Sequence, residues 1–105
     1  MEYKHILNLA LCICAQDGVI SETELKVLYK KLNEITKVSK KEFDLGIENF
    51  FENKLGLEEY LESASELGIN QQILDLCLDA ASSDGLNIKE NIAFQKAKSY
   101  WKLKP

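Results

Sequence analysis

The chain has 105 residues, a length that fits one domain built around a single hydrophobic core. Its net charge is -4 and its 13 basic residues are all Lys, so no Arg is present for bidentate contacts to phosphate or guanine, and we expect no nucleic-acid binding. With five Gly and one Pro, the composition leaves no room for a disordered linker, so we expect one ordered domain over residues 1–105.

Helical periodicity predicts six α-helices along the chain and no β-strand. The first and the fifth of them are apolar on most sides, which indicates burial in the core. The sequence therefore predicts an all-α, single-domain, compact helical bundle. The expected helices span residues 3–16, 22–37, 40–53, 57–67, 70–83 and 88–103.

The apolar stretch at residues 6–15 resembles the hydrophobic part of a signal peptide. A similar stretch recurs in mid-chain at residues 73–82, and the first is interrupted by Asn8 and is too short to span a bilayer. We therefore expect two buried helices, no transmembrane segment and a cytoplasmic protein. The cysteines within these stretches lack metal-site spacing and are interpreted as reduced core residues: Cys12, Cys14 and Cys77.

The two apolar helices lie in similar segments of sequence. Residues 6–18 and 73–85 are identical at six of 13 positions, at a constant offset of 67. Both segments end in Asp-Gly, and a Gly after a helix suits the left-handed conformation. We interpret the similarity as an internal duplication of a helix, Asp-Gly turn, helix unit. The expected halves are residues 3–37 and 70–103, joined by residues 40–67.

Each helix that follows an Asp-Gly turn begins with the pattern of a capping box, in which the cap residue and a glutamate three residues later bond to each other's backbone. The two patterns lie at residues 21–24 and 87–90, so their glutamates are Glu24 and Glu90. A third box at residues 39–42 starts the helix expected at residue 40.

The segment from Asp17 to Glu24 has the spacing of the second half of an EF-hand loop. The first half of such a loop is missing, because Ile13 and Ala15 stand where two oxygen ligands belong. We therefore expect no calcium loop of the usual kind.

What remains at the turns is a pair of carboxylates in each, Asp17 with Glu24 and Asp84 with Glu90. Capping and turn closure account for most of these acids without any ligand. The alternative is a divalent cation, Ca²⁺ or Mg²⁺, held by oxygen ligands. Asp79 joins the candidate metal ligands because it follows another aspartate by one helical turn, and such a like-charged pair is favoured by a nearby cation.

The segment Ala15-Gln16-Asp17-Gly18-Val19-Ile20 with Glu24, recurring near the C-terminus as residues 83–85 with Glu90, resembles the tellurite-resistance TerB-like family. The second motif departs from the family pattern because its acid stands one residue early. The resemblance implies a small, duplicated, all-helical, non-enzymatic module, tied to stress-response, membrane-associated or phage-related systems. It also implies metal binding through Asp17, Glu24 and Asp84, with Glu90 the position that the departure puts in doubt.

An enzyme is disfavoured by the sequence, because the only histidine, His5, has no paired nucleophile. The competing hypothesis is a protein-interaction module without a metal, and we expect a protein partner. Its surface would be the acidic helix at residues 57–67 with nearby aromatic side chains, whereas the last helix is basic. The candidate interaction residues are Glu58, Glu59 and Glu62, with Tyr60, Tyr100 and Trp101.

Overall fold

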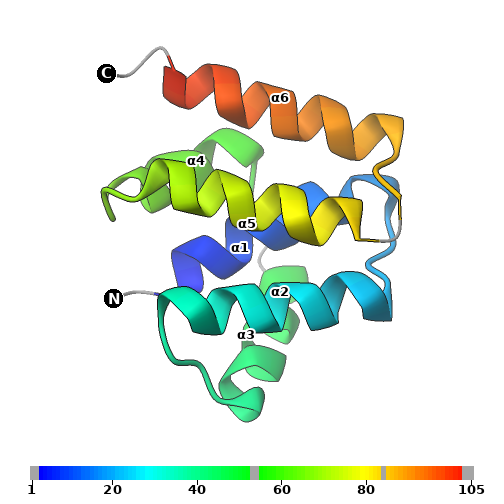
Figure 1. Cartoon of the computed structure of the whole chain (residues 1–105), viewed down its shortest axis with the longest axis vertical. Helices are drawn as coiled ribbons and strands as arrows, with labels where there is room; N and C mark the ends of the chain where they lie inside the picture. Colours follow the sequence, from blue (N-terminus) through cyan, green and yellow to red (C-terminus); the bar gives the residue numbers. More distant parts are fainter. Residues whose placement is uncertain (1–2, 53–54, 84, 103–105) are drawn as a thin grey trace.

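A computed structural model describes residues 3–52, 55–83 and 85–102, except the side chain of residue 17. These residues form six α-helices, one short 3-10 turn and no strand, so the predicted all-α bundle is confirmed (Figure 1). Each helix begins at the residue expected from the sequence and ends within two residues of the prediction. The elements are α1 (Tyr3–Cys14), η1 (Ala15–Asp17), α2 (Glu22–Ile35), α3 (Lys40–Glu52), α4 (Leu57–Ser65), α5 (Asn70–Ser82) and α6 (Ile88–Lys102).

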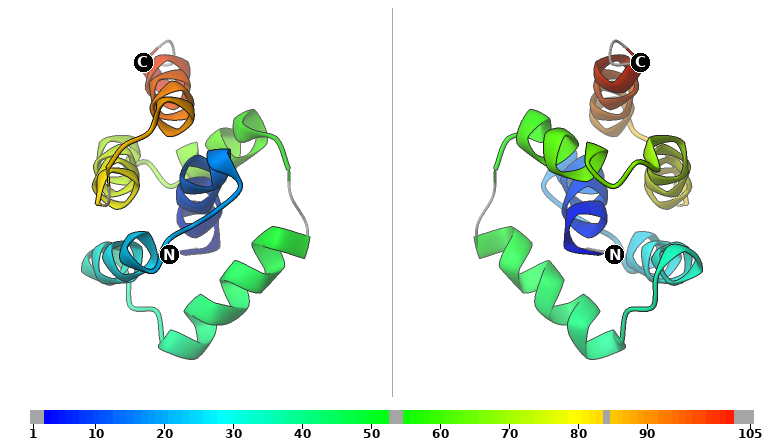
Figure 2. Two further views of the ribbon diagram at one scale, coloured as in Figure 1. Left: turned by 90° about the vertical axis from the view of Figure 1, so that its right-hand side faces the viewer. Right: turned by 90° about the vertical axis from the view of Figure 1, so that its left-hand side faces the viewer.

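Helix α1 lies at the centre of the bundle, and the other five described helices pack against it (Figure 2). Eight of its 12 residues are buried, because the helices packed around it exclude solvent from most of its surface. Helix α5 is different. It packs against α1, α2 and α6 and keeps Asp75 and Asp79 exposed. The expectation of burial on most sides is therefore confirmed for α1 and wrong for α5.

The turns after α1 and α5 lie at the same edge of the molecule, on the right in Figure 1 and toward the viewer in the left view of Figure 2. Gly18 and Gly85 have φ angles of 89° and 102°, which is the left-handed conformation expected after each helix. The 3-10 turn η1 also packs against α6. The N-terminus of α6 is thus brought close to the turn that precedes α2, while the internal duplication itself stays a hypothesis.

None of the helices in the described ranges is both long and apolar enough to cross a membrane.

Candidate cation site at the Asp-Gly turns

The first turn positions Glu24 by the predicted capping box. The Glu24 N–H donates to Ser21 Oγ at 3.1 Å, and the Ser21 N–H donates to Glu24 Oε1 at 2.9 Å. This reciprocal pair folds the glutamate side chain back over the start of α2. Glu24 is only 2% exposed, and its second carboxylate oxygen, Oε2, is also sealed from solvent.

The second turn positions Glu90 in the same way. The Glu90 N–H donates to Asn87 Oδ1 at 2.8 Å, and the Asn87 N–H donates to Glu90 Oε1 at 3.5 Å. Glu90 is also 2% exposed. In the second Asp-Gly turn the glutamate stands one residue earlier in sequence than in the first. It still lies at the start of the following helix and is still buried.

The capping box of α3 provides a comparison within the same chain. The Glu42 N–H donates to Ser39 Oγ at 3.1 Å, and the Ser39 N–H donates to Glu42 Oε1 at 3.0 Å, so its geometry matches that of the first turn. Glu42 is nevertheless exposed. Hydrogen bonds from the backbone and the side chain of Ser39 hold the pKa of Glu42 below its ordinary value.

A capping glutamate thus needs no burial, as Glu42 demonstrates. Taking a carboxylate out of water costs free energy unless a charge or several hydrogen bonds offset the loss of solvation. Among the described residues, Glu24 and Glu90 are the buried charged side chains, and each stands directly after an Asp-Gly turn. Capping therefore accounts for the position of these two glutamates along the helix, while their burial depends on what surrounds the two turns.

The aspartates of the two turns belong to the same predicted set. The backbone of Asp17 forms the end of η1, directly before the left-handed Gly18. The side chain of Asp17 and the whole of Asp84 lie outside the described residues. Among the side chains that the structure does describe, no three His, Cys, Asp or Glu lie together as a metal site would require. The metal role of all four acids stays a prediction.

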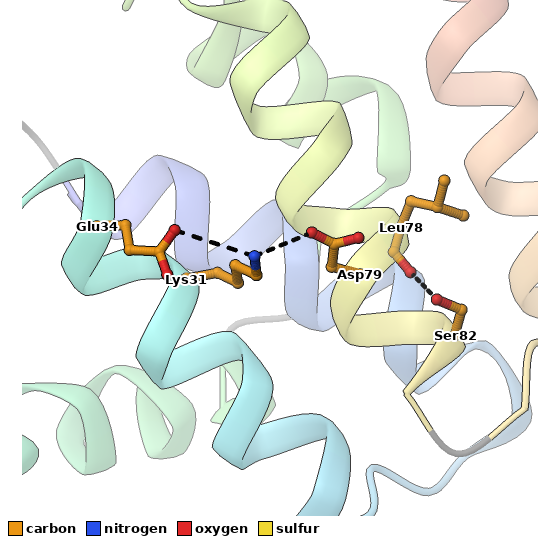
Figure 3. A network of polar contacts seen from close by, with 5 residues as sticks. All are labelled: Lys31, Glu34, Leu78, Asp79 and Ser82. Carbon is orange, nitrogen blue, oxygen red and sulfur yellow. Dashed lines mark hydrogen bonds and ion pairs between the residues drawn. The ribbon is translucent and has the colours of Figure 1, made fainter.

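Asp79, the fifth candidate ligand, faces α2. Its Oδ2 lies 3.4 Å from Lys31 Nζ, which is also 4.0 Å from Glu34 Oε1 (Figure 3). The other aspartate on this face, Asp75, accepts a hydrogen bond from Gln71 Nε2 at 2.9 Å. The positive charge beside Asp79 is therefore a lysine ammonium, which relieves the repulsion between the two aspartates that suggested a metal.

The acidic residues of α4 are exposed, as the interaction hypothesis requires. Two of them also make local contacts. Glu59 Oε1 accepts the Gly56 N–H at 3.4 Å, which covers the start of α4. Glu62 Oε1 accepts the Tyr100 hydroxyl at 2.9 Å. Of the three acids on α4, Glu59 and Glu62 are thus the ones that make these contacts within the described residues.

Two of the aromatic side chains expected on that surface belong to the core. Tyr60 is 4% exposed and Trp101 is 5% exposed. The Tyr60 hydroxyl accepts the Leu55 N–H at 2.9 Å, and Trp101 Nε1–H donates to the Leu61 carbonyl at 3.1 Å. Each ring packs on apolar neighbours while its polar atom reaches backbone, so neither ring is available to a partner.

No family model matches the chain, and comparisons with curated proteins and with solved structures find no significant similarity. The fold and the two turns thus define an all-α helical bundle with buried glutamates at the start of α2 and α6. Membership of the TerB-like family stays a prediction from the sequence motif.

Proposed function

We propose that this chain is a small non-enzymatic helical module that binds a divalent cation, Ca²⁺ or Mg²⁺, at its Asp-Gly turns. The ligands in this proposal are Asp17, Glu24, Asp84 and Glu90. The observation that carries it is the burial of Glu24 and Glu90 at 2% exposure beside the exposed Glu42. In line with the TerB-like motif, the module would serve a stress-response, membrane-associated or phage-related system.

The donor chemistry supports a hard cation. Ca²⁺ and Mg²⁺ bind carboxylate and carbonyl oxygens, whereas Zn²⁺ favours Cys and His, and the proposed set contains carboxylates alone. A bound cation would also offset the cost of holding two carboxylates out of water. The turns lie at one edge, where η1 packs against α6, which favours joint use of the two acidic pairs.

The test is a titration of the full chain with Ca²⁺, Mg²⁺ and Zn²⁺, followed by the backbone amide shifts of Gly18 and Gly85 and by the thermal midpoint. Both glycines follow a proposed ligand, so we expect both amides to shift with Ca²⁺ or Mg²⁺. At about 100 times the Kd, a cation that binds only the folded state stabilises it by about 2.7 kcal/mol.

The matched variants are Glu24→Gln and Glu42→Gln. In each, the new amide oxygen can still accept the backbone N–H of the cap residue, so the helix start is retained. Glu24→Gln should abolish the cation-dependent stabilisation, and Glu42→Gln should leave it unchanged. The cation role is rejected if neither Gly18 nor Gly85 shifts at millimolar ion, or if the two variants behave alike.

The alternative is a protein-interaction module that binds no metal. The observation that favours it is the exposed acidic side of α4, which borders an open groove. Reversing Glu58, Glu59 and Glu62 to Lys would test that face, because binding of a partner that survives the reversal would reject it.

A further inference from the structure

An open groove of about 1010 Å³ runs between α4 and α6. Its floor is apolar and consists of side chains that belong to the core. Cys12, Leu61 and Ala93 lie there and are 8%, 1% and 3% exposed. The groove therefore offers apolar contacts between two well-anchored helices, which is the arrangement that receives an amphipathic helix in helix-in-groove recognition.

Large apolar side chains stand exposed along this groove. On the α4 side Leu55 is 55% exposed, and on the α6 side Ile92 is 49% exposed. Ile88, one turn before Ile92 on the same helix, is 79% exposed. The spacing of Ile88, Ile92, Gln95 and Ser99 places them on one stripe of α6. Exposed apolar side chains gathered on one face mark an interaction surface.

The same face carries both signs of charge. Glu58 lines the groove from α4 and Lys96 lines it from α6. Within the part of the chain that the structure describes, neither side chain takes part in an ion pair. A face with an acidic side and a basic side is complementary to its own copy under a two-fold rotation, because the acidic side of each copy then meets the basic side of the other.

We propose that this face joins two copies of the chain in a symmetric dimer. The α4–α6 face is defined by Leu55, Glu58, Ile88, Ile92 and Lys96. In the dimer, α6 of each copy lies along the groove of the other. Ile92 enters the apolar groove, and Lys96 lies beside Glu58 of the second copy, with every contact made twice. This assembly uses none of the proposed cation ligands, so the test of the dimer does not depend on whether a cation binds.

Sedimentation equilibrium of the full chain tests the dimer, from micromolar to millimolar concentration without added divalent cation. We expect the mass to rise from 11.9 kDa toward twice that value as the concentration increases. Ile92→Asp should keep the mass at that of the monomer across the range, because it places a charge in the apolar groove. Ile92 is half exposed, so the fold should persist, and circular dichroism checks this.

Charge reversal tests the registry of the two copies. Glu58→Lys and Lys96→Glu should each raise the dimer Kd by about tenfold or more, because each places like charges opposite one another. The double variant Glu58→Lys/Lys96→Glu should restore the Kd to within about threefold of the original. Glu48→Lys is the matched control, since it makes the same charge change on α3, away from the groove, and should leave the Kd unchanged.

Three results would overturn the proposal. The first is a chain that stays monomeric up to millimolar concentration, which would assign the groove to a different protein. The second is a dimer that tolerates Ile92→Asp. The third is a pair of weakening single reversals that the double variant does not rescue, which would show that Glu58 and Lys96 do not meet across the two-fold axis.

Discussion

Gly46 of α3 lies directly against Leu7 of α1, and a Cβ atom built on Gly46 would overlap Leu7 Cδ2. Leu7 is fully buried, so it can move away from a new Cβ only by repacking against its neighbours. We predict that Gly46→Ala lowers the free energy of unfolding. Overpacking costs about 1–3 kcal/mol, which exceeds the gain of about 1 kcal/mol from replacing a glycine within a helix. Urea denaturation measures the change.

Removing the methyl groups that the new Cβ meets provides the control. In a Leu7→Ala background the overlap disappears, so Gly46→Ala should become neutral or stabilising, and the two substitutions should be strongly non-additive. A stabilising effect of Gly46→Ala in the original chain would mean that α3 can shift away from α1 at little cost.

Lys31 and Asp79 connect α2 to α5 through partly exposed side chains, which are 36% and 48% exposed. Solvent screens such a pair, so we predict that Asp79→Asn lowers the free energy of unfolding by less than about 1 kcal/mol, with a smaller effect at high salt. Because Lys31 already faces this carboxylate, Asp79→Asn should leave the affinity for Ca²⁺ or Mg²⁺ unchanged. A large loss of cation affinity in the amide-shift titration would instead make Asp79 a ligand.

The capping boxes show how far local sequence determines local structure. The pattern of a cap residue and a glutamate three residues later predicts the boxes of α2, α3 and α6, because the hydrogen bonds involve only neighbouring residues. The same pattern cannot separate the buried Glu24 and Glu90 from the exposed Glu42. Burial depends on which elements pack over the helix start. The contact between η1 and α6 joins parts of the chain that are far apart in sequence, so only the tertiary fold produces it.

The sequence contains a feature that distinguishes the environments of α1 and α5, although the overall composition of the two helices does not. Each helix contains three leucines, yet only α5 has two aspartates, Asp75 and Asp79, one turn apart on a single face. Two like charges at that spacing indicate a face in contact with solvent. Likewise, the spacing of Ile88 and Ile92 on α6 indicates a stripe, but only the packing of Ala93, Phe94 and Ala97 into the core shows that this stripe points outward.

Cys77 should make the protein less stable in alkaline solution. Burial, with a smaller contribution from the charge of Cys12, raises the pKa of the Cys77 thiol well above its ordinary value of 9.0. Above about pH 9 the unfolded chain releases this proton and the folded chain keeps it, so the unfolded state is favoured as the pH rises. The contribution of this group to the free energy of unfolding then falls by up to about 1.4 kcal/mol per pH unit.

Urea denaturation of the original chain and of Cys77→Ala between pH 7.5 and 10 separates this effect from other titrations. The variant loses stability at every pH because it leaves a cavity, but its stability should fall less steeply with pH. Equal slopes in the two proteins would contradict a buried, protonated Cys77.

Thiol-reactive reagents should also label Cys12, at 8% exposure on the floor of the groove, before the fully buried Cys14 and Cys77.

Trp101 ties α6 to α4 by its indole N–H, which donates to the Leu61 carbonyl at 3.1 Å. We predict that Trp101→Phe lowers the free energy of unfolding by about 1–3 kcal/mol, because it removes a buried hydrogen bond and leaves unfilled space beside the ring. The neighbouring Tyr100→Phe is the matched control. Its hydroxyl reaches the exposed Glu62, where water can replace the lost bond, so the change should be below about 0.5 kcal/mol. Equal losses in the two variants, measured by urea denaturation, would contradict the prediction, because they would mean that the buried Trp101 bond contributes no more to stability than the Tyr100 bond at the surface.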